Sequence, residues 1–325
     1  MTAYVIRRLL YAVPIILGVM VLTFILFFVL ATPQTIARQV LGDKAKQEVI
    51  DAWIKMKGLD KPSIFNAKAP GLAKITDTLL GQHMTSLATF RFGNSWQDDK
   101  PIGRKILQYT GPSLAYTAPT FFFGLLIAIS LALILAYFRS TYVDKYGTFL
   151  CVLGMSIVIV VYILGFQWIL SISWKLVPIA GWAEGPERLR FILLPVIIGV
   201  VAGIGGSARF YRTIMIEETT KDYVRTARAK GLPESVVLFK HILKNAMIPI
   251  LTNSVLAIPF LIMGSLLMET FFSIPGLGRF AVDALFSNDF PSLRAIVFIG
   301  AVLYQAGLIM TDISYGLVDP RVTFK

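Results

Sequence analysis

The sequence predicts an all-α membrane protein with six transmembrane helices. Two observations lead to this fold class. Hydrophobic residues make up 56% of the 325 residues and charged residues only 15%, whereas a soluble domain is usually about 45–50% apolar and about 25% charged. Six apolar runs are also long enough to cross a bilayer, which takes about 20 residues of helix. The chain is therefore expected to be embedded in a membrane rather than folded around a large soluble core.

The six apolar runs follow one another at Leu9–Ala31, Ser113–Phe138, Gly147–Ser173, Phe191–Tyr211, Ala246–Met268 and Ala295–Leu317. All are expected to be α-helical, because lipid offers no partner for unpaired backbone groups and the runs are too long and continuous for barrel strands. The first run follows Arg7 and Arg8, as the core of a signal peptide does, but it is too long for one and no Ala-x-Ala site is evident. We interpret it as a retained anchor.

Lysine and arginine residues in the short loops predict the orientation. Fourteen of them, from Arg7 to Lys325, lie on the side of the N-terminus, and five lie on the other side: Lys175, Arg188, Arg190, Arg279 and Arg294. Both termini are therefore predicted to be cytoplasmic. The expected parts are an N-terminal tail with the first transmembrane helix (1–31), one long extracytoplasmic cap loop (32–112), and a five-helix core (113–325) with a cytoplasmic loop at 212–246.

The cap loop contains one amphipathic segment, Lys46–Pro62. Its apolar residues have helical spacing, and Gly58 and Pro62 end it: Val49, Ile50, Trp53, Ile54 and Met56. We expect a short helix that caps the membrane surface or the neighbouring spans, in preference to a substrate-binding domain.

The loop between the fourth and fifth spans is basic and has the pattern of helix, break, helix. Gly231 suits the end of a helix, because it has no Cβ, and Pro233 suits the first turn of the next. Beyond the break, one face is apolar (Val236, Val237, Phe239, Ile242 and Leu243), and Lys240 and Lys244 lie one turn apart on another side. On residues alone, two interpretations stay open: a helix on the inner leaflet with its cations near anionic lipid, or a lever to which a cytoplasmic partner docks.

Several classes of function are disfavoured by what the sequence lacks. Cys151 is the single cysteine, and with His83 and His241 it forms no zinc-binding pattern. The sequence contains no HExxH, GxxxxGK[ST] or GxSxG motif, so it carries no ATP-hydrolysing motif of its own. The net charge of +12 fits basic loops on a membrane protein, because no nucleic-acid-binding motif accompanies it.

Ordered motifs along nearly the whole chain carry a family resemblance. "DYVRTARAKGL" and "KHILKNAMIP" resemble the cytoplasmic EAA-type coupling loop of ATP-binding-cassette (ABC) importer permeases. Five further motifs resemble the B-type subunit of the dipeptide/oligopeptide/nickel permease family: "YVIRRLLYAVPIILGVMVLTF", "GLDKP", "RFGNSW", "ETFFSIPGLGRFAVDAL" and "DISYGLVDPRV". Thr226-Ala227-Arg228 replaces Glu-Ala-Ala, and Lys244 replaces a proline, as in the peptide subfamily. The segment from about Ser63 to Phe90 matches the family poorly.

The resemblance implies a permease subunit of an ATP-driven, binding-protein-dependent importer in a bacterial or archaeal cytoplasmic membrane. Di- or oligopeptides are the expected substrates, and nickel, other metal chelates or sugars are the alternatives. The resemblance also implies a second permease, two ATPase subunits that hold ATP and Mg, and an extracytoplasmic substrate-binding protein as partners. No cofactor, metal site or catalytic residue is expected in this chain, and no nucleic acid. A stand-alone secondary transporter or channel is the alternative, and an intramembrane enzyme ranks last because no reactive residues converge in the spans.

The resemblance and the residue pattern together single out three sets of candidates. Coupling to the ATPase is assigned to Tyr223, Ala227, Arg228, Ala229, Gly231, Leu232 and Lys240. Candidates for the pathway or a gate are Glu269, Pro275, Gly276, Gly278 and Asp312. Candidates for close helix packing are Gly199, Gly203 and Gly206.

Each set leaves alternatives open. Glu269 can meet a peptide amino group or Arg279, and "SIPGLG" can be a gate loop or a plain tight turn. Pairing of Asp312 with a cytoplasmic arginine is favoured over a functional role. The glycines can pack within one subunit or line the pathway. Arg209 and Arg212 are expected to reach lipid phosphate, and "VDPRV", 318–322, is expected to end the sixth span.

Overall fold

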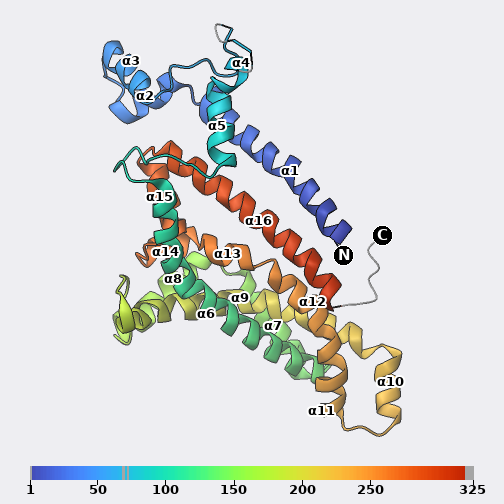
Figure 1. The fold of residues 1–325 in the computed structure, drawn as a ribbon. Helices are drawn as coiled ribbons and strands as arrows, with labels where there is room; N and C mark the ends of the chain where they lie inside the picture. The colour runs from blue at the N-terminus through green and yellow to red at the C-terminus, as the bar shows by residue number, and fades with distance from the viewer. Residues whose placement is uncertain (1, 68–69, 72, 319–325) are drawn as a thin grey trace. The chain divides into compact units, whose positions relative to one another are not determined.

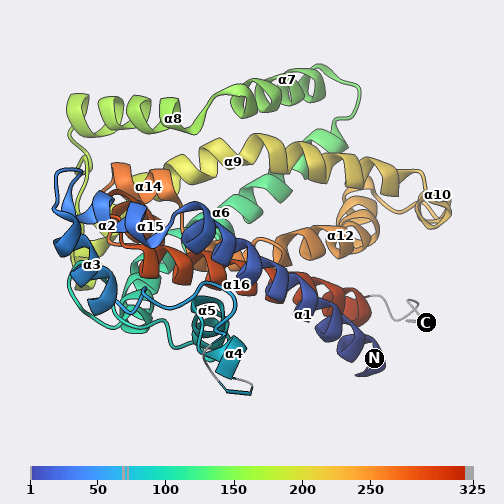
Figure 2. The same ribbon diagram turned by 90° about the horizontal axis from the view of Figure 1, so that it is seen from above.

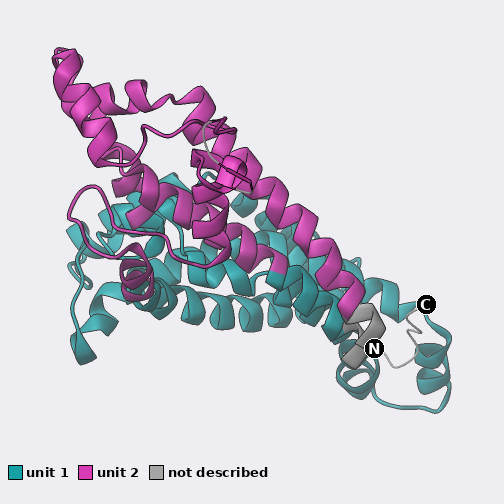
Figure 3. Ribbon diagram, turned by 45° about the horizontal axis from the view of Figure 1, so that its top comes forward, with its two compact units in different colours: residues 1, 110–279, 306–325 teal, residues 2–109, 280–305 magenta. Residues whose placement is uncertain are grey.

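The computed structural model describes residues 2–67, 70–71 and 73–318. It divides into two compact units (Figure 3). Unit 1 contains Thr110–Arg279 and Ala306–Lys325 together with Met1, and unit 2 contains Thr2–Tyr109 and Phe280–Gln305. The described residues are helical and form no strand, which confirms the all-α prediction.

Within the described residues, five helical segments are long and apolar enough to cross a membrane: Ile6–Leu30, Ile102–Tyr137, Gly185–Thr219, Glu234–Phe271 and Phe290–Ser314. A sixth candidate is a pair of helices, Tyr142–Ser156 and Ile159–Ser173, that meet at 94°. The count of six predicted spans is therefore confirmed only if this bent pair is one span. Its sharp bend corrects the expectation of a continuous helix at Gly147–Ser173.

The bend has a local cause in the backbone. Helix α7 (Tyr142–Ser156) stops before Ile157 and Val158, which are both extended, and α8 (Ile159–Phe166) continues as a π-helical turn, η2 (Gln167–Ser173). Branching at Cβ makes isoleucine and valine easier to place in extended backbone than most apolar residues. Both helices pack along α9 (Arg188–Thr219), as Figure 2 shows.

The fifth predicted span, Ala246–Met268, is also interrupted. The segments in order are α11 (Glu234–Val236), η4 (Val237–Leu243), α12 (Lys244–Val255), α13 (Ile258–Met263) and α14 (Leu266–Phe271). Pro259 lies in the first turn of α13, where its missing N–H costs least. Gly264 ends α13 with a φ of +68°, and the Ser265 hydroxyl then caps α14 by accepting from the Met268 N–H. The breaks bring loop-like backbone close to the Glu269 carboxyl.

The described residues of unit 1 include two apolar cores. One joins α6 (Ile102–Tyr137), α7, α9, α10 (Asp222–Ala229), η4 and α12, with Leu135, Met215, Val224, Val237 and Ile242 among its buried residues. The other joins α6, α8, α9 and α14 around Tyr116, Ile163, Ile198 and Phe272. The loop after α9 is thus packed onto the helix bundle of unit 1 through its own apolar side chains.

Unit 2 contains α1 (Thr2–Phe24), its π-helical extension η1 (Ile25–Leu30), and four short helices: α2 (Pro33–Leu41), α3 (Gln47–Met56), α4 (Ala73–Thr76) and α5 (Leu79–Ala88). Most of α15 (Leu277–Phe286) and the first part of α16 (Phe290–Val318) also belong to it. Helices α1 to α5, α15 and α16 are labelled in Figure 1.

The amphipathic helix predicted at Lys46–Pro62 is confirmed as α3. Ile50, Trp53 and Ile54 are buried against Phe24 and Phe28 of the first span, whereas Val49 and Met56 are exposed. The cap segment therefore shares one core with the end of the first span.

His83 is a buried histidine of α5 whose charge state bears on the stability of unit 2. Its Nε2 lies 3.0 Å from the Met20 carbonyl oxygen and 3.1 Å from the Thr23 hydroxyl. Since the carbonyl can only accept, Nε2 carries the proton. Burial, reinforced by the charge of Arg294, lowers the pKa of His83 from 6.5 to about 4. The folded protein therefore keeps His83 neutral at pH values at which an unfolded chain protonates it.

We expect the folded state to lose stability on acidification between about pH 6.5 and pH 4. Above about pH 6.5, His83 is neutral in the folded and in the unfolded state. Between about pH 6.5 and pH 4, only the unfolded chain binds the proton. Below about pH 4, His83 is protonated in both states. The full loss is roughly 3 kcal/mol. Thermal unfolding of the purified protein from pH 7.5 to 4.5 measures it, and a His83→Gln variant is expected to show a flatter profile. Equal slopes would show that other groups set the acid sensitivity.

Candidate functional site

Helix α10 ends in a glycine-dependent stop that fixes the turn of the basic loop. The Leu232 N–H donates to the Ala227 carbonyl at 3.4 Å, and the Gly231 N–H donates to the Arg228 carbonyl at 2.9 Å. This pair of bonds is the Schellman motif, which requires left-handed backbone at the residue after the helix. Gly231 supplies it with a φ of +72°. Pro233 directly precedes α11 in extended backbone, one position earlier than the predicted first turn.

The two faces of α10 have different surroundings. Val224 and Ala227 are buried within unit 1 against the residues of η4, such as Val237. Of the predicted coupling residues, Ala227 therefore positions the helix, whereas six are exposed: Tyr223, Arg228, Ala229, Gly231, Leu232 and Lys240. Figure 1 shows α10 and α11 at the end of unit 1 where α9 stops and α12 begins.

An ion pair spans the turn. The Arg228 guanidinium donates to both carboxylate oxygens of Glu234, with Nη2–Oε1 at 2.5 Å and Nε–Oε2 at 3.1 Å. Both side chains are 45% exposed, so the pair contributes about 1 kcal/mol or less. Its two-point geometry nevertheless restricts the angle between α10 and α11. Beside it, the Tyr223 hydroxyl donates to Glu218, and burial with this bond raises the pKa of Tyr223 to about 12.

Arg212 of α9 does not extend toward lipid phosphate as predicted. Its guanidinium forms a two-point ion pair with Asp144 of α7, with Nε–Oδ1 at 2.6 Å and Nη2–Oδ2 at 2.7 Å. Asp144 also accepts from the Ser140 N–H at 3.0 Å, and it is 5% exposed. The partner was missed because it lies 68 residues away in the sequence. The pair joins α7 to the last turns of α9, next to the basic loop.

We expect Asp144→Ala to destabilise unit 1 by about 3 kcal/mol, because it leaves the half-buried Arg212 cation without its partner. Thermal unfolding in detergent measures the effect. The double variant Asp144→Ala, Arg212→Ala is expected to recover part of the loss, since no uncompensated charge remains. An additive double variant would show that the two side chains act independently.

Glu269 of α14 has a fully buried carboxyl that joins three segments of unit 1. On α6, the Ser113 hydroxyl donates to Oε1 at 2.7 Å and the Tyr116 hydroxyl at 3.3 Å. After α14, the Arg279 N–H donates to Oε2 at 2.9 Å, and the Gly278 N–H also contributes. The expected contact with Arg279 is thus made through its backbone N–H.

The two hydroxyls of α6 relay further backbone bonds to the carboxyl. Ser113 accepts from the Leu277 N–H at 2.9 Å, and Tyr116 accepts from the Ser265 N–H at 2.9 Å. Each hydroxyl therefore takes a hydrogen bond from one flank of α14 and donates to Glu269. A network in which every member is satisfied strengthens its individual bonds in a low-dielectric interior.

Three glycines leave the space that this carboxyl fills. A Cβ at Gly264 would lie 1.8 Å from Oε1, one at Gly276 would lie 2.3 Å from the carboxyl carbon, and one at Gly278 would lie 3.0 Å from Oε2. The Gly276 N–H donates to the Ile274 carbonyl at 2.8 Å, which makes a tight turn around Pro275. The structure thus brings together four of the predicted gate residues in a closed turn: Glu269, Pro275, Gly276 and Gly278. Asp312 lies half-buried on α16 outside this network, and Arg321 lies outside the described residues.

The predicted packing glycines of α9 fall into two groups. A Cβ at Gly199 would lie 2.6 Å from the Thr120 methyl of α6, so this glycine permits close contact. Gly205, which the sequence analysis missed, lies against the Cys151 carbonyl of α7, with a Cβ distance of 2.4 Å. Within the described chain, Gly203 and Gly206 face open space. Of the three predicted packing glycines, Gly199 is therefore the one that close helix packing within this subunit explains.

Gly203 borders a cleft of about 200 Å³ between α6, α9 and α12. Its walls mix small and polar side chains, which include Thr120, Ser207, Tyr211 and Asn253. Asn253 is exposed on this single chain. An amide on a membrane-spanning helix is costly in lipid, so such a face is suited to water or to another polypeptide.

A family model described as "Binding-protein-dependent transport system inner membrane component" matches residues 124–324, well over half of the chain. A second model, described as the N-terminal part of such membrane components, matches residues 1–115. The chain belongs to this family. It is a permease component of a binding-protein-dependent transport system and a multi-pass protein of the cytoplasmic membrane.

Relatives of the permease match over their full lengths. It is 30% identical over 330 residues to the oligopeptide transport system permease protein AppB of Bacillus subtilis strain 168, with all of both chains covered. It is 28% identical over 349 residues to the dipeptide transport system permease protein DppB of Alkalihalophilus pseudofirmus, and 30% identical over 327 residues to the glutathione transport system permease protein GsiC of Salmonella paratyphi A. Both matches also cover all of each chain.

The network around Glu269 shows what sequence reasoning missed in this permease. Ser113 and Tyr116 lie more than 150 residues before Glu269. The sequence points to them in one way only: they are two hydroxyl-bearing residues three positions apart at the start of an apolar run. This spacing places them on one face of a helix. The break at Gly264 could have been predicted from the serine that follows it. A Gly-Ser pair inside a helical pattern is typical of one helix that ends and a second helix that begins with a serine cap.

Proposed function

We propose that this permease forms part of an ATP-driven importer of peptides, in which it lines the translocation pathway with a second permease and is driven by two ATPase subunits. The observation that carries the substrate class is the full-length match to proteins named for oligopeptide, dipeptide and glutathione transport. A tripeptide such as glutathione, a dipeptide and an oligopeptide share a peptide backbone and charged termini. We therefore assign short peptides as the substrate.

The basic loop is the proposed contact with the ATPase. It carries an exposed cationic surface, and the chain has no nucleotide-binding motif. Its turn is held by the Schellman bonds at Gly231 and by the Arg228–Glu234 pair, while Val224 and Ala227 anchor α10 to the bundle. A helix held in this way transmits displacement to α9 and α12, because both are packed against the same core. This proposal places the loop and both termini in the cytoplasm.

Alternating access is proposed to follow from movement of these loops. ATP and Mg, bound by the partner subunits, supply a closure that brings two coupling loops together. The permease pair then changes between inward-open and outward-open arrangements as rigid groups of helices. The ATPase must bind the two arrangements with different affinity, because equal affinity would not shift the equilibrium between them. The cleft beside Gly203, with Asn253 exposed, supports a pathway on this face of unit 1.

Reconstitution tests the proposal against a stand-alone transporter. Proteoliposomes with the permease, its partner permease, the ATPases and the binding protein are expected to accumulate labelled di- and tripeptides only with ATP and Mg. Liposomes with this chain alone are expected to show no proton-driven or sodium-driven uptake. Peptide flux through the chain alone, driven by an ion gradient, would instead establish the secondary transporter.

A further inference from the structure

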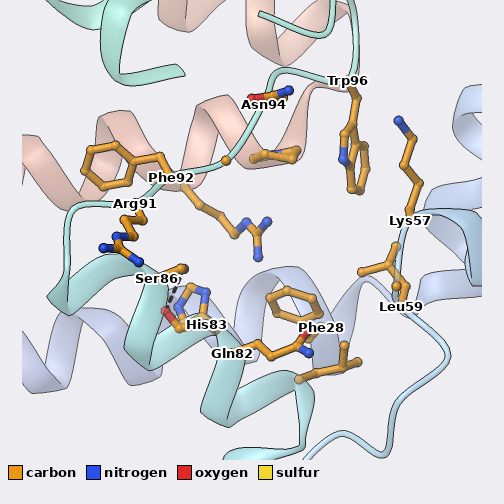
Figure 4. Close-up of a pocket in the computed structure, with 15 residues that line it drawn as sticks. Phe28, Lys57, Leu59, Gln82, His83, Ser86, Arg91, Phe92, Asn94 and Trp96 are labelled. Carbon is orange, nitrogen blue, oxygen red and sulfur yellow. Dashed lines mark hydrogen bonds between the residues drawn. The ribbon is translucent and has the colours of Figure 1, made fainter. Parts of the chain in front are cut away.

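Unit 2 contains a cavity of about 260 Å³ that the proposed transport mechanism does not use (Figure 4). Its walls come from the end of the first span, the turn after α3, helix α5, the loop 91–96 and the first turns of α16. Two of these wall segments contain the motifs "GLDKP" and "RFGNSW", which are 28 residues apart in the sequence. The fold brings both motifs to one cavity, although neither takes part in coupling.

The charged residues that line the cavity are all cations. They are Lys57, Arg91 and Arg294, and no aspartate or glutamate of the described residues lines it. Among the described residues, none of the three has an acidic partner within ion-pair distance. Instead, the Arg294 guanidinium lies 4.7 Å from the centre of the Phe28 ring, and the Lys57 ammonium lies 6.0 Å from that of Trp96. Arg294 and Lys57 are thus held by aromatic faces, and all three cations remain available for an anion.

The acid that most influences Arg294 is already engaged. Asp289 accepts from the Ser95 hydroxyl at 2.5 Å, the Ser292 hydroxyl at 2.6 Å and the Trp96 N–H at 3.0 Å. These bonds fasten the loop 91–96 to the start of α16 and hold Trp96 at the cavity. The positive field of Arg294 extends to His83, which also lines the cavity, and contributes to the lowered pKa of that group. The cavity is therefore electropositive even with Asp289 nearby.

The remaining lining combines aromatic surface with neutral hydrogen-bonding groups. Phe28, Phe92 and Trp96 supply rings, and Gln82 and Asn94 supply amides, as Figure 4 shows. A bare inorganic ion would use the cations alone, whereas an organic anion would also use the aromatic and amide groups of the lining. A guanidinium and an ammonium bind a carboxylate through charge-assisted hydrogen bonds.

We propose that this cavity is a binding site for a small organic carboxylate whose anionic group is attached to an apolar or aromatic body. Arg294 neutralises the carboxylate, the charges of Arg91 and Lys57 on either side add to the positive potential, and Phe28 and Trp96 contact the body. The site lies at the end of two membrane-spanning helices, since Phe28 is near the end of the first and Arg294 near the start of the last. It does not depend on the peptide assignment above, because it rests on unit 2 alone.

Equilibrium dialysis with the full-length protein in phosphatidylcholine nanodiscs tests the site. The probe is labelled N-acetylphenylalanine, and its neutral counterpart is N-acetylphenylalanine amide. We expect the acid to bind at least tenfold more tightly than the amide, and to weaken as NaCl rises from 50 to 500 mM. Arg91→Gln and Lys57→Gln, both outside the packed core, are each expected to weaken binding of the acid about threefold, as loss of a neighbouring positive charge implies.

Lys55→Gln is the matched control, because Lys55 is an exposed cation on α3 that does not line the cavity. It is expected to leave binding unchanged. Equal binding of acid and amide, or equal effects of Lys55→Gln and Lys57→Gln, would overturn the proposal. Displacement of the probe by inorganic phosphate at equal concentration would overturn the assignment of an organic anion. Thermal unfolding of each variant shows that unit 2 stays folded.

Discussion

Gly264→Ala is expected to abolish accumulation of the folded permease. Its new Cβ would lie 1.8 Å from Oε1 of the buried Glu269, at a backbone φ of +68° that alanine rarely adopts. Either the carboxyl leaves its four donors or α13 and α14 move apart, and each breaks the network on α6. Overpacking, backbone strain and lost hydrogen bonds together amount to about 3 kcal/mol or more, which is a large part of the stability of an ordinary domain.

Membrane levels on a quantitative blot, and size-exclusion profiles of the detergent-solubilised protein, measure this effect. Gly206→Ala is the matched control, because a Cβ at Gly206 meets no atom within 4 Å in the described chain. The control is expected to accumulate normally, whatever it does to transport. A Gly264→Ala protein that elutes and unfolds like the unmodified permease would show that folding does not require the space that the glycines leave around Glu269.

Gly231→Val is expected to leave the permease in the membrane but to reduce ATP-dependent uptake at least tenfold. The left-handed backbone at Gly231 is incompatible with a β-branched residue, so the turn must rearrange and α10 must change its angle. In the part of the chain that the structure describes, no atom lies within 4 Å of the position that a Cβ at Gly231 would take. The predicted loss therefore arises from the turn itself and not from a clash in the core.

Uptake and ATP hydrolysis measured in the same proteoliposomes separate coupling from folding. Gly42→Val is a matched control, because Gly42 also has a positive φ, +94°, and open surroundings, but it ends α2 in the cap segment. It is expected to suffer similar local strain without loss of coupling. Equal uptake by Gly231→Val and Gly42→Val would contradict a mechanical role for the α10 turn.

The sequence predicted helix content and the positions of apolar runs well, because burial in lipid demands long apolar helices. It did not predict the breaks at Ile157–Val158 and at Gly264, since hydropathy sums over a window hide one or two residues of extended backbone. The break at Gly231 was predicted, because a glycine and a proline two residues apart mark it in a polar segment where no apolar run masks them.

The sequence predicted some candidate residues but not the partners that they contact. Glu269 and the following turn stood out as an acid and a glycine-proline cluster at the end of a span. Their partners Ser113 and Tyr116 are distant in sequence, so only the fold reveals that the turn closes around the carboxyl. Asp144 and Arg212 are a similar case. Long-range ion pairs inside a helix bundle carry no local pattern that one sequence discloses.

Cross-linking from Ala229 tests the central claim most directly, namely that the α10 loop contacts the ATPase. Cys151 is the single cysteine and is buried, so Cys151→Ser gives a background for Ala229→Cys on the exposed face of α10. With a reagent that attaches to this thiol and carries a photoreactive group at its other end, we expect in the assembled transporter a covalent product that contains an ATPase subunit, and none from Lys55→Cys on α3. A product from Lys55→Cys but not from Ala229→Cys would contradict the account.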